Sequence, residues 1–164
     1  DFVVEFLLPR LKQRLVQQQQ QGGESTKMTF YYQRPPTLRL QPGPATKAYV
    51  KHHRDADYGH QNGELNYWIP LTQTTPSPSS SSLPPTLWIE STPNQGDYHP
   101  IQCSSYGEGV SFHGSSCIHY VPKNMSDKTR VSLDFRIGVE EYGFDSMWQM
   151  VGTKDDHTRR KVIM

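Results

Sequence analysis

A succession of short β-type runs, separated by turn residues, most constrains what this chain can fold into. From Thr29 onward, runs rich in β-branched and aromatic residues alternate with stretches that contain Gly, Asn or Pro, such as Gln61-Asn62-Gly63. The expected strands are 30–33, 37–40, 48–53, 66–71, 87–90, 101–103, 109–112, 118–121 and 130–137. No helical crossover of the kind that parallel strands need separates these runs, so the pattern predicts an all-β sandwich or barrel.

The first 26 residues follow a different pattern. Apolar residues recur there at every fourth position, at Val3, Leu7, Leu11 and Leu15, which is the period of an amphipathic helix. Pro9 interrupts that period, so we expect the helix to kink or restart there. The sequence therefore predicts three parts: an N-terminal helix and Gln-rich linker over 1–26, a β core over 27–137, and a C-terminal tail over 138–164.

The apolar content of the chain is low for a globular domain. Residues of the hydrophobic class make up 34% of the 164 residues, a length that predicts one domain. The Ser/Pro-rich stretch 73–86 accounts for part of the deficit, because it has almost no side chains that can pack in a core. We expect this stretch to form a disordered loop inside the β core.

Charge and cysteine content narrow the functional class. The 17 basic and 16 acidic residues form no basic cluster interleaved with aromatics, so we expect no binding to nucleic acid. The two cysteines, Cys103 and Cys117, fit neither a disulfide scaffold nor a CxxC pair, and no apolar run is long enough to span a membrane. We therefore expect a cytoplasmic protein without membrane association. The chain starts with Asp1, so we expect a processed form or a fragment.

One histidine stands out as a candidate metal ligand. Of the seven histidines, only His53 has an acidic residue two positions later, in His53-Arg54-Asp55. Residues i and i+2 of an extended strand point the same way, so the imidazole and the carboxylate can reach one ion together. His119 lies in a separate expected strand that a barrel can bring against them. Two histidines and one carboxylate on one face form the ligand set of non-haem Fe(II) oxygenases.

Other readings of these histidines stay open. The triad residues can also be buried hydrogen-bonding groups of a cupin-like structural barrel. Zinc is a rival, since Cys117 and His119 are an i,i+2 pair, and Cys103 and His113 lie near each other in sequence, although zinc sites usually show tighter, repeated spacing. His113 is the alternative to His119 as a ligand. We expect His52 and His60, which flank the His-x-Asp motif, to be supporting or surface residues.

A second candidate group lies eleven positions after His119. Arg130-Val131-Ser132 is the only Arg-x-Ser in the chain, and strand alternation places its guanidinium and hydroxyl on one face. Such a pair suits a carboxylate, because arginine offers a planar fork of donors and serine adds one more. On the expected strand after the His-x-Asp motif, alternation separates Asn66 and Trp68 from Tyr67 and Ile69 and leaves open which set faces the interior.

The order of these motifs resembles a known family. His-x-Asp, a distal histidine, ten further residues and Arg-x-Ser together are similar to the Fe(II)/2-oxoglutarate-dependent dioxygenases, whose fold is a double-stranded β-helix, or jelly roll. The stretches 53–60 and 129–136 also resemble a bacterial and algal subgroup similar to an oxygenase associated with streptomycin biosynthesis. The resemblance covers about residues 29–137. Members of the family usually carry more than the fifty or so residues that precede the His-x-Asp motif here, so we expect an incomplete major sheet.

The resemblance implies a role for each candidate residue. His53, Asp55 and His119 would bind Fe(II), Arg130 and Ser132 would hold the distal carboxylate of 2-oxoglutarate, and Asn66 would contact co-substrate or substrate. With O2 as the other co-substrate, the implied activity is hydroxylation of a small-molecule substrate. The alternative is a catalytically incomplete cupin-like barrel that binds a small molecule or a partner. Neither the substrate nor the oligomeric state follows from the sequence.

Overall fold

The computed structural model describes residues 1–18, 27–74, 86–103, 107–147 and 159–164. Within them lie a π-helical turn at Val3–Leu7, the helix α1 (Leu8–Gln18), and the short 3-10 helices η2 (Asp55–Tyr58) and η3 (Glu140–Tyr142). The strands are β1 (Thr29–Gln33), β2 (Thr37–Gln41), β3 (Val50–His53), β4 (Glu64–Pro70), β5 (Trp88–Ile89), β6 (His99–Pro100), β7 (Val110–Phe112), β8 (His119–Val121), β9 (Arg130–Val139) and β10 (Arg159–Ile163). The protein is thus mostly β, as the sequence predicts.

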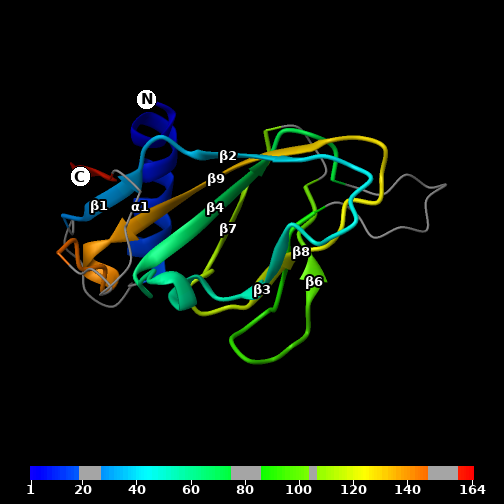
Figure 1. Ribbon diagram of the computed structural model, residues 1–164. Coiled ribbons are helices and arrows are strands. Elements are labelled where there is room, and N and C mark those ends of the chain that lie inside the picture. Colours follow the sequence, from blue (N-terminus) through cyan, green and yellow to red (C-terminus); the bar gives the residue numbers. More distant parts are fainter. Residues whose placement is uncertain (19–26, 75–85, 104–106, 148–158) are drawn as a thin grey trace.

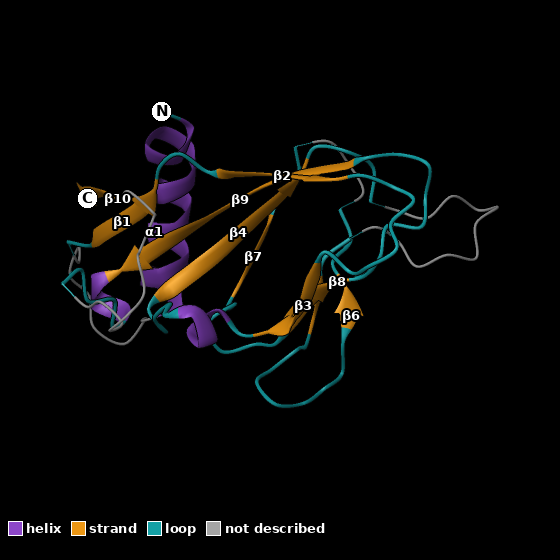
Figure 2. Ribbon diagram, in the orientation of Figure 1, coloured by secondary structure: helices purple, strands orange, loops and turns teal. Residues whose placement is uncertain are grey.

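These strands form two antiparallel sheets (Figures 1 and 2). The large sheet has the order β10-β1-β9-β4-β7, and β2 also pairs with β9, beyond the end of β1. The small sheet has the order β3-β8-β5-β6. One cavity is lined by residues of β4 and β9 from the large sheet and of β3 and β8 from the small sheet, so the two sheets face each other across it.

The helix α1 covers the other face of the large sheet. Its buried residues Leu8, Leu11 and Leu15 pack in one apolar cluster with residues of β1 and β9. Pro9 is the second residue of α1, and the π-helical turn Val3–Leu7 passes directly into α1, since the N–H of Leu8 donates to the Val3 carbonyl. The expected helix is confirmed, and near the proline it changes from π-helical to α-helical geometry without a break.

Alternation along β4 separates the two faces of the large sheet. Leu65, Tyr67 and Ile69 pack against the cluster under α1, whereas Trp68 belongs to a second buried cluster on the cavity side. Asn66 shares the face of Trp68 and lines the cavity. Of the two sets that the sequence left open, Asn66 and Trp68 are therefore the one that faces the cavity between the sheets.

The structure corrects two strand assignments. The strand expected at 101–103 is wrong: β6 ends at Pro100, and the single backbone hydrogen bond from the Ile101 N–H to the Leu87 carbonyl (2.8 Å) does not extend it. The sequence predicts only a tail after 138, yet β9 continues to Val139 and β10 pairs with β1. The sequence of β10 is largely charged and lacks apolar alternation because this edge strand is mostly exposed.

Two predicted segments lie largely outside the described residues: most of the Gln-rich linker (19–26) and of the Ser/Pro loop (75–85). Thr74 and Thr86, which flank the loop, are buried, and the Thr86 hydroxyl donates to the Ile101 carbonyl at 2.6 Å. Among the described helices, none has the length and apolar character that crossing a membrane would require.

Candidate metal centre

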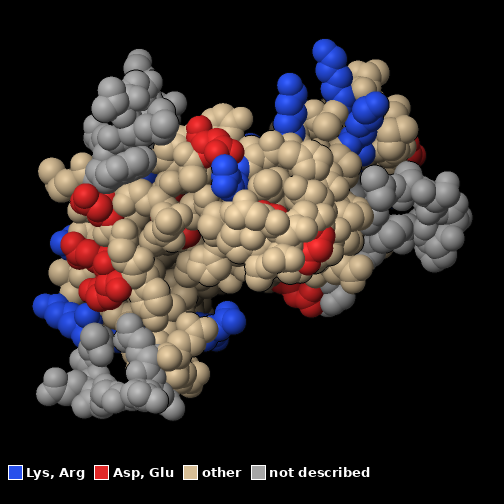
Figure 3. Space-filling model, turned by 90° about the horizontal axis from the view of Figure 1, so that it is seen from below, with Lys and Arg blue, Asp and Glu red and all other residues tan. Residues whose placement is uncertain are grey.

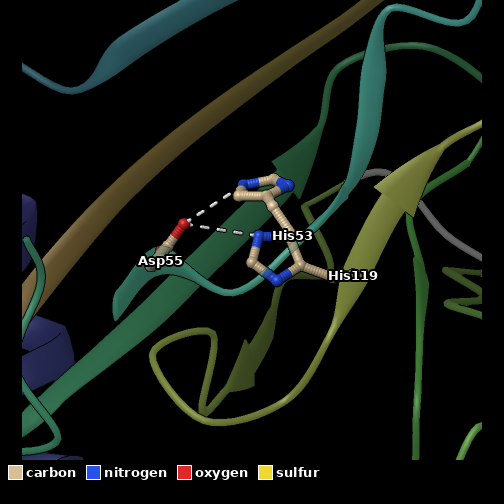
Figure 4. Close-up of side chains that lie close together, drawn as sticks. All are labelled: His53, Asp55 and His119. Carbon is tan, nitrogen blue, oxygen red and sulfur yellow. Dashed lines mark ion pairs between the residues drawn. The ribbon is translucent and has the colours of Figure 1, made fainter. Parts of the chain in front are cut away.

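Three side chains from neighbouring elements converge at the edge of the small sheet. His53 is the last residue of β3, Asp55 opens η2, and His119 is the first residue of β8, directly opposite His53 in the strand register. One potential ligand atom from each of the three lies within 4.8 Å of the others. Asp55 Oδ1 is 3.4 Å from Nε2 of His53 and 3.5 Å from Nε2 of His119. Figure 4 shows the three side chains pointing toward one another.

Backbone carbonyls fix both imidazoles. Nδ1 of His53 donates to the carbonyl of Lys51 (2.8 Å), and Nδ1 of His119 donates to the carbonyl of Cys117 (3.1 Å). Each bond therefore places a proton on Nδ1 and turns Nε2 toward Asp55. Hydrogen bonding to Asp55 raises the pKa of His53, although burial opposes the change. A metal ion bound here would replace the Nε2 proton, as metal binding generally does.

Asp55 is held from the large sheet. Its Oδ2 accepts hydrogen bonds from Nε and Nη2 of Arg136 (3.1 and 2.8 Å) and from Nδ2 of Asn66 (2.6 Å), which leaves Oδ1 for the histidines. Burial alone would raise the pKa of Asp55. The hydrogen bonds with the two histidines and the positive charge of Arg136 outweigh burial and hold that pKa well below its ordinary value. The carboxylate is therefore ionised and oriented as a ligand.

Asn66 was expected to contact co-substrate or substrate. In the structure, both ends of its amide form hydrogen bonds within the protein. Its Nδ2 donates to Asp55, and its Oδ1 accepts the N–H of Gly114 (3.2 Å). The carbonyl of Gly114 in turn accepts the N–H of Asp55 (2.8 Å). A Cβ at position 114 would lie 2.7 Å from the Asn66 amide, so glycine is needed for this close approach. The loop between β7 and β8 and the strand β4 thus jointly position the carboxylate.

Asn66→Ala is expected to weaken metal binding by about 10- to 100-fold, because Asp55 loses a partner that orients it. Titration with Co(II), followed by its visible absorption, measures the change. Asn124→Ala is the matched control: Asn124 is equally buried, but it bonds the carbonyls of Gln41 and Lys128. The control should lose stability and keep its metal affinity. Equal losses of affinity in both variants would contradict the positioning role.

Sequence reasoning missed two supporting residues. Arg136 lies on the same face of β9 as Arg130 and Ser132, so strand alternation was a signal that places it toward the cavity. Glu90 gave no such signal. Its buried carboxylate accepts the N–H of Ile118 at 2.6 Å, and its own N–H donates to the Ile118 carbonyl at 3.1 Å. Glu90 therefore fixes the backbone immediately before His119.

The other histidines of the described residues and the two cysteines are not part of the group of ligand atoms that the triad forms. His52 stacks on Tyr120 (3.8 Å between ring centroids), and Nδ1 of His60 is 2.8 Å from Glu64. His113 is exposed, in the loop after β7. Cys103 and Cys117 are buried in the apolar cluster around Trp68. Within the described residues, the group that can hold a metal is His53, Asp55 and His119, so the cysteine-based zinc alternative gains no support.

Arg130 and Ser132 form a second polar group in the interior. Their exposed fractions are 2% and 0%, and Arg130 lies over the Trp68 ring at 5.5 Å. Among the described residues, Nε and Nη1 of Arg130 and Oγ of Ser132 have no hydrogen-bond partner. Burial, aided by the nearby charge of Arg39, lowers the pKa of Arg130 to about 10, so it is still cationic at neutral pH. Unsatisfied buried donors of this kind are costly, and an anionic ligand would satisfy them.

Both groups open into the same space. A cavity of about 600 Å³ is lined by the triad, Asn66, Arg136 and Arg130. Its other walls include the aromatic residues Tyr49, Tyr58, Trp68 and Phe112. A volume of this size accommodates small molecules. A metal ion at the triad and an anion at Arg130 would therefore be neighbours in one pocket.

The fold and the site define a mostly β protein of two facing antiparallel sheets, with a His–Asp–His candidate metal centre between them. The sequence is similar to the streptomycin biosynthesis protein StrG of Streptomyces griseus, with 36% identity over 106 residues, which make up 65% of this chain and 45% of StrG. The chain thus spans less than half the length of that relative. No protein-family profile matches the chain. A solved structure of a non-heme monooxygenase, a ThoJ–Ni complex, aligns over 66% of this chain and 44% of its own, with 18% identity and a TM-score of 0.47.

Proposed function

We propose that this protein is a non-haem iron oxygenase that couples oxidative decarboxylation of 2-oxoglutarate to hydroxylation of a small-molecule substrate. The observation that carries the proposal is the buried Arg130, which lines the cavity of the His53–Asp55–His119 triad and whose Nε and Nη1 have no hydrogen-bond partner among the described residues; Oγ of Ser132, two positions along the same strand, has none either. Neither group alone defines the reaction. Together they supply a metal site and an anion site in one pocket.

The donor set of the triad favours iron. Two imidazole nitrogens and one carboxylate oxygen come from one side, and such a set leaves coordination positions open for exogenous ligands. A structural zinc site would instead be closed by four protein ligands, usually with cysteines among them. We therefore assign Fe(II) to the triad. The facing antiparallel sheets with the triad between them also support the proposal of a double-stranded β-helix fold.

The Arg130–Ser132 group favours a dicarboxylate. A guanidinium presents parallel donors that match a carboxylate, and the adjacent hydroxyl adds another donor. Arg130 has no carboxylate partner among the described residues, and we propose that a ligand supplies one. A molecule whose carboxylate is bound by Arg130 can also bind a metal ion at the triad only if its other end chelates metal. 2-Oxoglutarate has both features.

Each residue has a defined task in the proposed reaction. When bound, Fe(II) supplies the oxidative chemistry by which substrate C–H, O2 and 2-oxoglutarate become C–OH, succinate and CO2. Arg136 helps to keep the Asp55 carboxylate ionised, and Arg136 and Asn66 together orient it. Arg130 and Ser132 hold the far end of the co-substrate, and Trp68 shields Arg130 from water. The role of StrG in streptomycin biosynthesis supports a small molecule as the substrate.

Spectroscopy without oxygen tests the proposal. Adding Fe(II) and 2-oxoglutarate to the protein is expected to produce a weak visible charge-transfer band, and admitting O2 should release succinate and CO2. A folded wild-type protein that shows no band would contradict the proposal. A band without any succinate, with all candidate substrates, would instead identify a binding module that no longer catalyses turnover.

A further inference from the structure

Two loops lie side by side at the mouth of the cavity. The loop 42–49 leads into β3, and the loop 122–129 connects β8 to β9. The N–H of Ala45 donates to the Asn124 carbonyl (2.8 Å), and the buried Asn124 side chain donates to the carbonyls of Gln41 (2.9 Å) and Lys128 (2.7 Å). A Cβ at Gly43 would lie 2.1 Å from the Ser126 carbonyl oxygen, so the backbones are in close contact. The two loops therefore form one structured rim.

The rim adjoins the cavity at the end of the first loop and at the strand residues that flank the second. Ala48 and Tyr49, at the end of the first loop, line the cavity together with Val50, the first residue of β3. The second loop begins after Val121 and ends before Arg130, and both of these residues also line it. Lys51, on β3, lines the cavity itself, so the cavity and the basic side chains of the adjoining loops are neighbours.

These side chains carry a concentrated positive charge. Over 42–53 and 121–129 the charged residues are four lysines, Lys47, Lys51, Lys123 and Lys128, and one acid, Asp127. All four lysines are exposed, and within the described residues none pairs with a carboxylate. In Figure 1 both loops lie at the right-hand end of the molecule, and Figure 3 shows basic side chains projecting together at that end. The whole chain is formally only +1, so the rim is distinct from the average surface.

We infer that the rim of Lys47, Lys51, Lys123 and Lys128 selects an anionic small molecule as the substrate, by holding its phosphate or carboxylate group at the cavity mouth. This inference rests on the proposed function. A basic rim beside a cavity raises the local concentration of anions and repels cations, and lysine is a common ligand of phosphate. In the proposed function, Arg130 binds the carboxylate of the co-substrate. The second anion is therefore bound by the lysines.

Pyrophosphate serves as the probe for this rim. Calorimetric titration into the Fe(II)- and 2-oxoglutarate-loaded protein, without oxygen, should show binding that weakens at least tenfold in Lys47→Gln/Lys123→Gln. The matched control, Lys27→Gln/Lys161→Gln, removes two exposed lysines next to or within β1 and β10 and should bind within twofold of wild type. Added salt should weaken wild-type binding, because these charges are exposed. No binding, or equal binding by both double variants, would overturn the inference.

A second measurement separates a small-molecule site from an acidic-protein surface. Pyrophosphate held at the mouth should slow the release of 2-oxoglutarate, followed by decay of the charge-transfer band. Rim-dependent binding that leaves this release unchanged would contradict the small-molecule assignment. The band also separates the two proposals: its absence in wild type refutes the oxygenase, whereas the anion preference of the rim is still measured by titrating the protein alone.

Discussion

His119→Ala is expected to abolish the Fe(II)–2-oxoglutarate band and to weaken metal binding at least about 100-fold. The effect exceeds the 10- to 100-fold loss typical of supporting residues, because the variant removes a ligand atom itself. The fold should survive, since β8 keeps its backbone pairing with β3 and β5. Anaerobic titration with Fe(II), read by the visible band, and with Co(II), read by calorimetry, measures both quantities.

The control for this variant is His113→Ala. His113 was the sequence-level alternative to His119, but it is exposed, and the structure places it outside the cluster of ligand atoms. Its replacement should leave the band and the metal affinity within twofold of wild type. If His113→Ala lost the band and His119→Ala retained it, the assignment of the triad would be wrong.

Arg130→Met is expected to stabilise the ligand-free protein and to abolish its response to 2-oxoglutarate. Wild type buries a guanidinium with unsatisfied donors, and an apolar side chain of similar volume removes that penalty. After allowing for the lost contact with Trp68, the free energy of unfolding should rise by about 1–2 kcal/mol. At 100 times its dissociation constant, 2-oxoglutarate should stabilise wild type by about 2.7 kcal/mol and the variant not at all.

Arg130→Met should therefore be more stable than wild type without 2-oxoglutarate and less stable than wild type with it. Urea unfolding with Fe(II) present and oxygen excluded, with and without 2-oxoglutarate, measures both differences, and the Fe(II) affinity of the variant should match that of wild type. Arg39→Met is the matched control. Arg39 lines the same cavity but makes a bidentate pair with Asp134 (2.7 and 3.0 Å), so its loss should destabilise the protein by up to about 1 kcal/mol. An Arg130→Met protein that is less stable than wild type in both conditions would refute the anion-site assignment.

Local patterns in the sequence were sufficient for most of the elements. The period of the apolar residues gave the first helix because its stripe of leucines packs against the sheet. Most strands were found because their half-buried faces alternate. β10 was not predicted, since an exposed edge strand needs no apolar alternation and is defined by its pairing with β1. The strand expected at 101–103 failed because short apolar runs also occur where the chain only passes through the core.

The candidate site divides in the same way. Residue type and spacing within a strand are local, so the sequence alone proposed the pairs His53 with Asp55 and Arg130 with Ser132. The partners that orient Asp55, namely Arg136 and Asn66, come from different strands and act through contacts that sequence distance does not encode. The choice between His119 and His113 likewise needed the register of β3 against β8.

By itself, the sequence determined the β-rich class, the amphipathic helix and the chemical character of the candidate ligands, because these depend on side-chain type and on periods of a few residues. The tertiary structure decided which face of β4 looks inward, that Arg130 and Ser132 are buried without partners, and that the lysines of two distant loops share one rim. The physical reason is that burial and electrostatic environment arise only when segments far apart in the chain pack together. The concentration of charge at the cavity mouth is therefore a property of the fold, although every lysine in it is visible in the sequence.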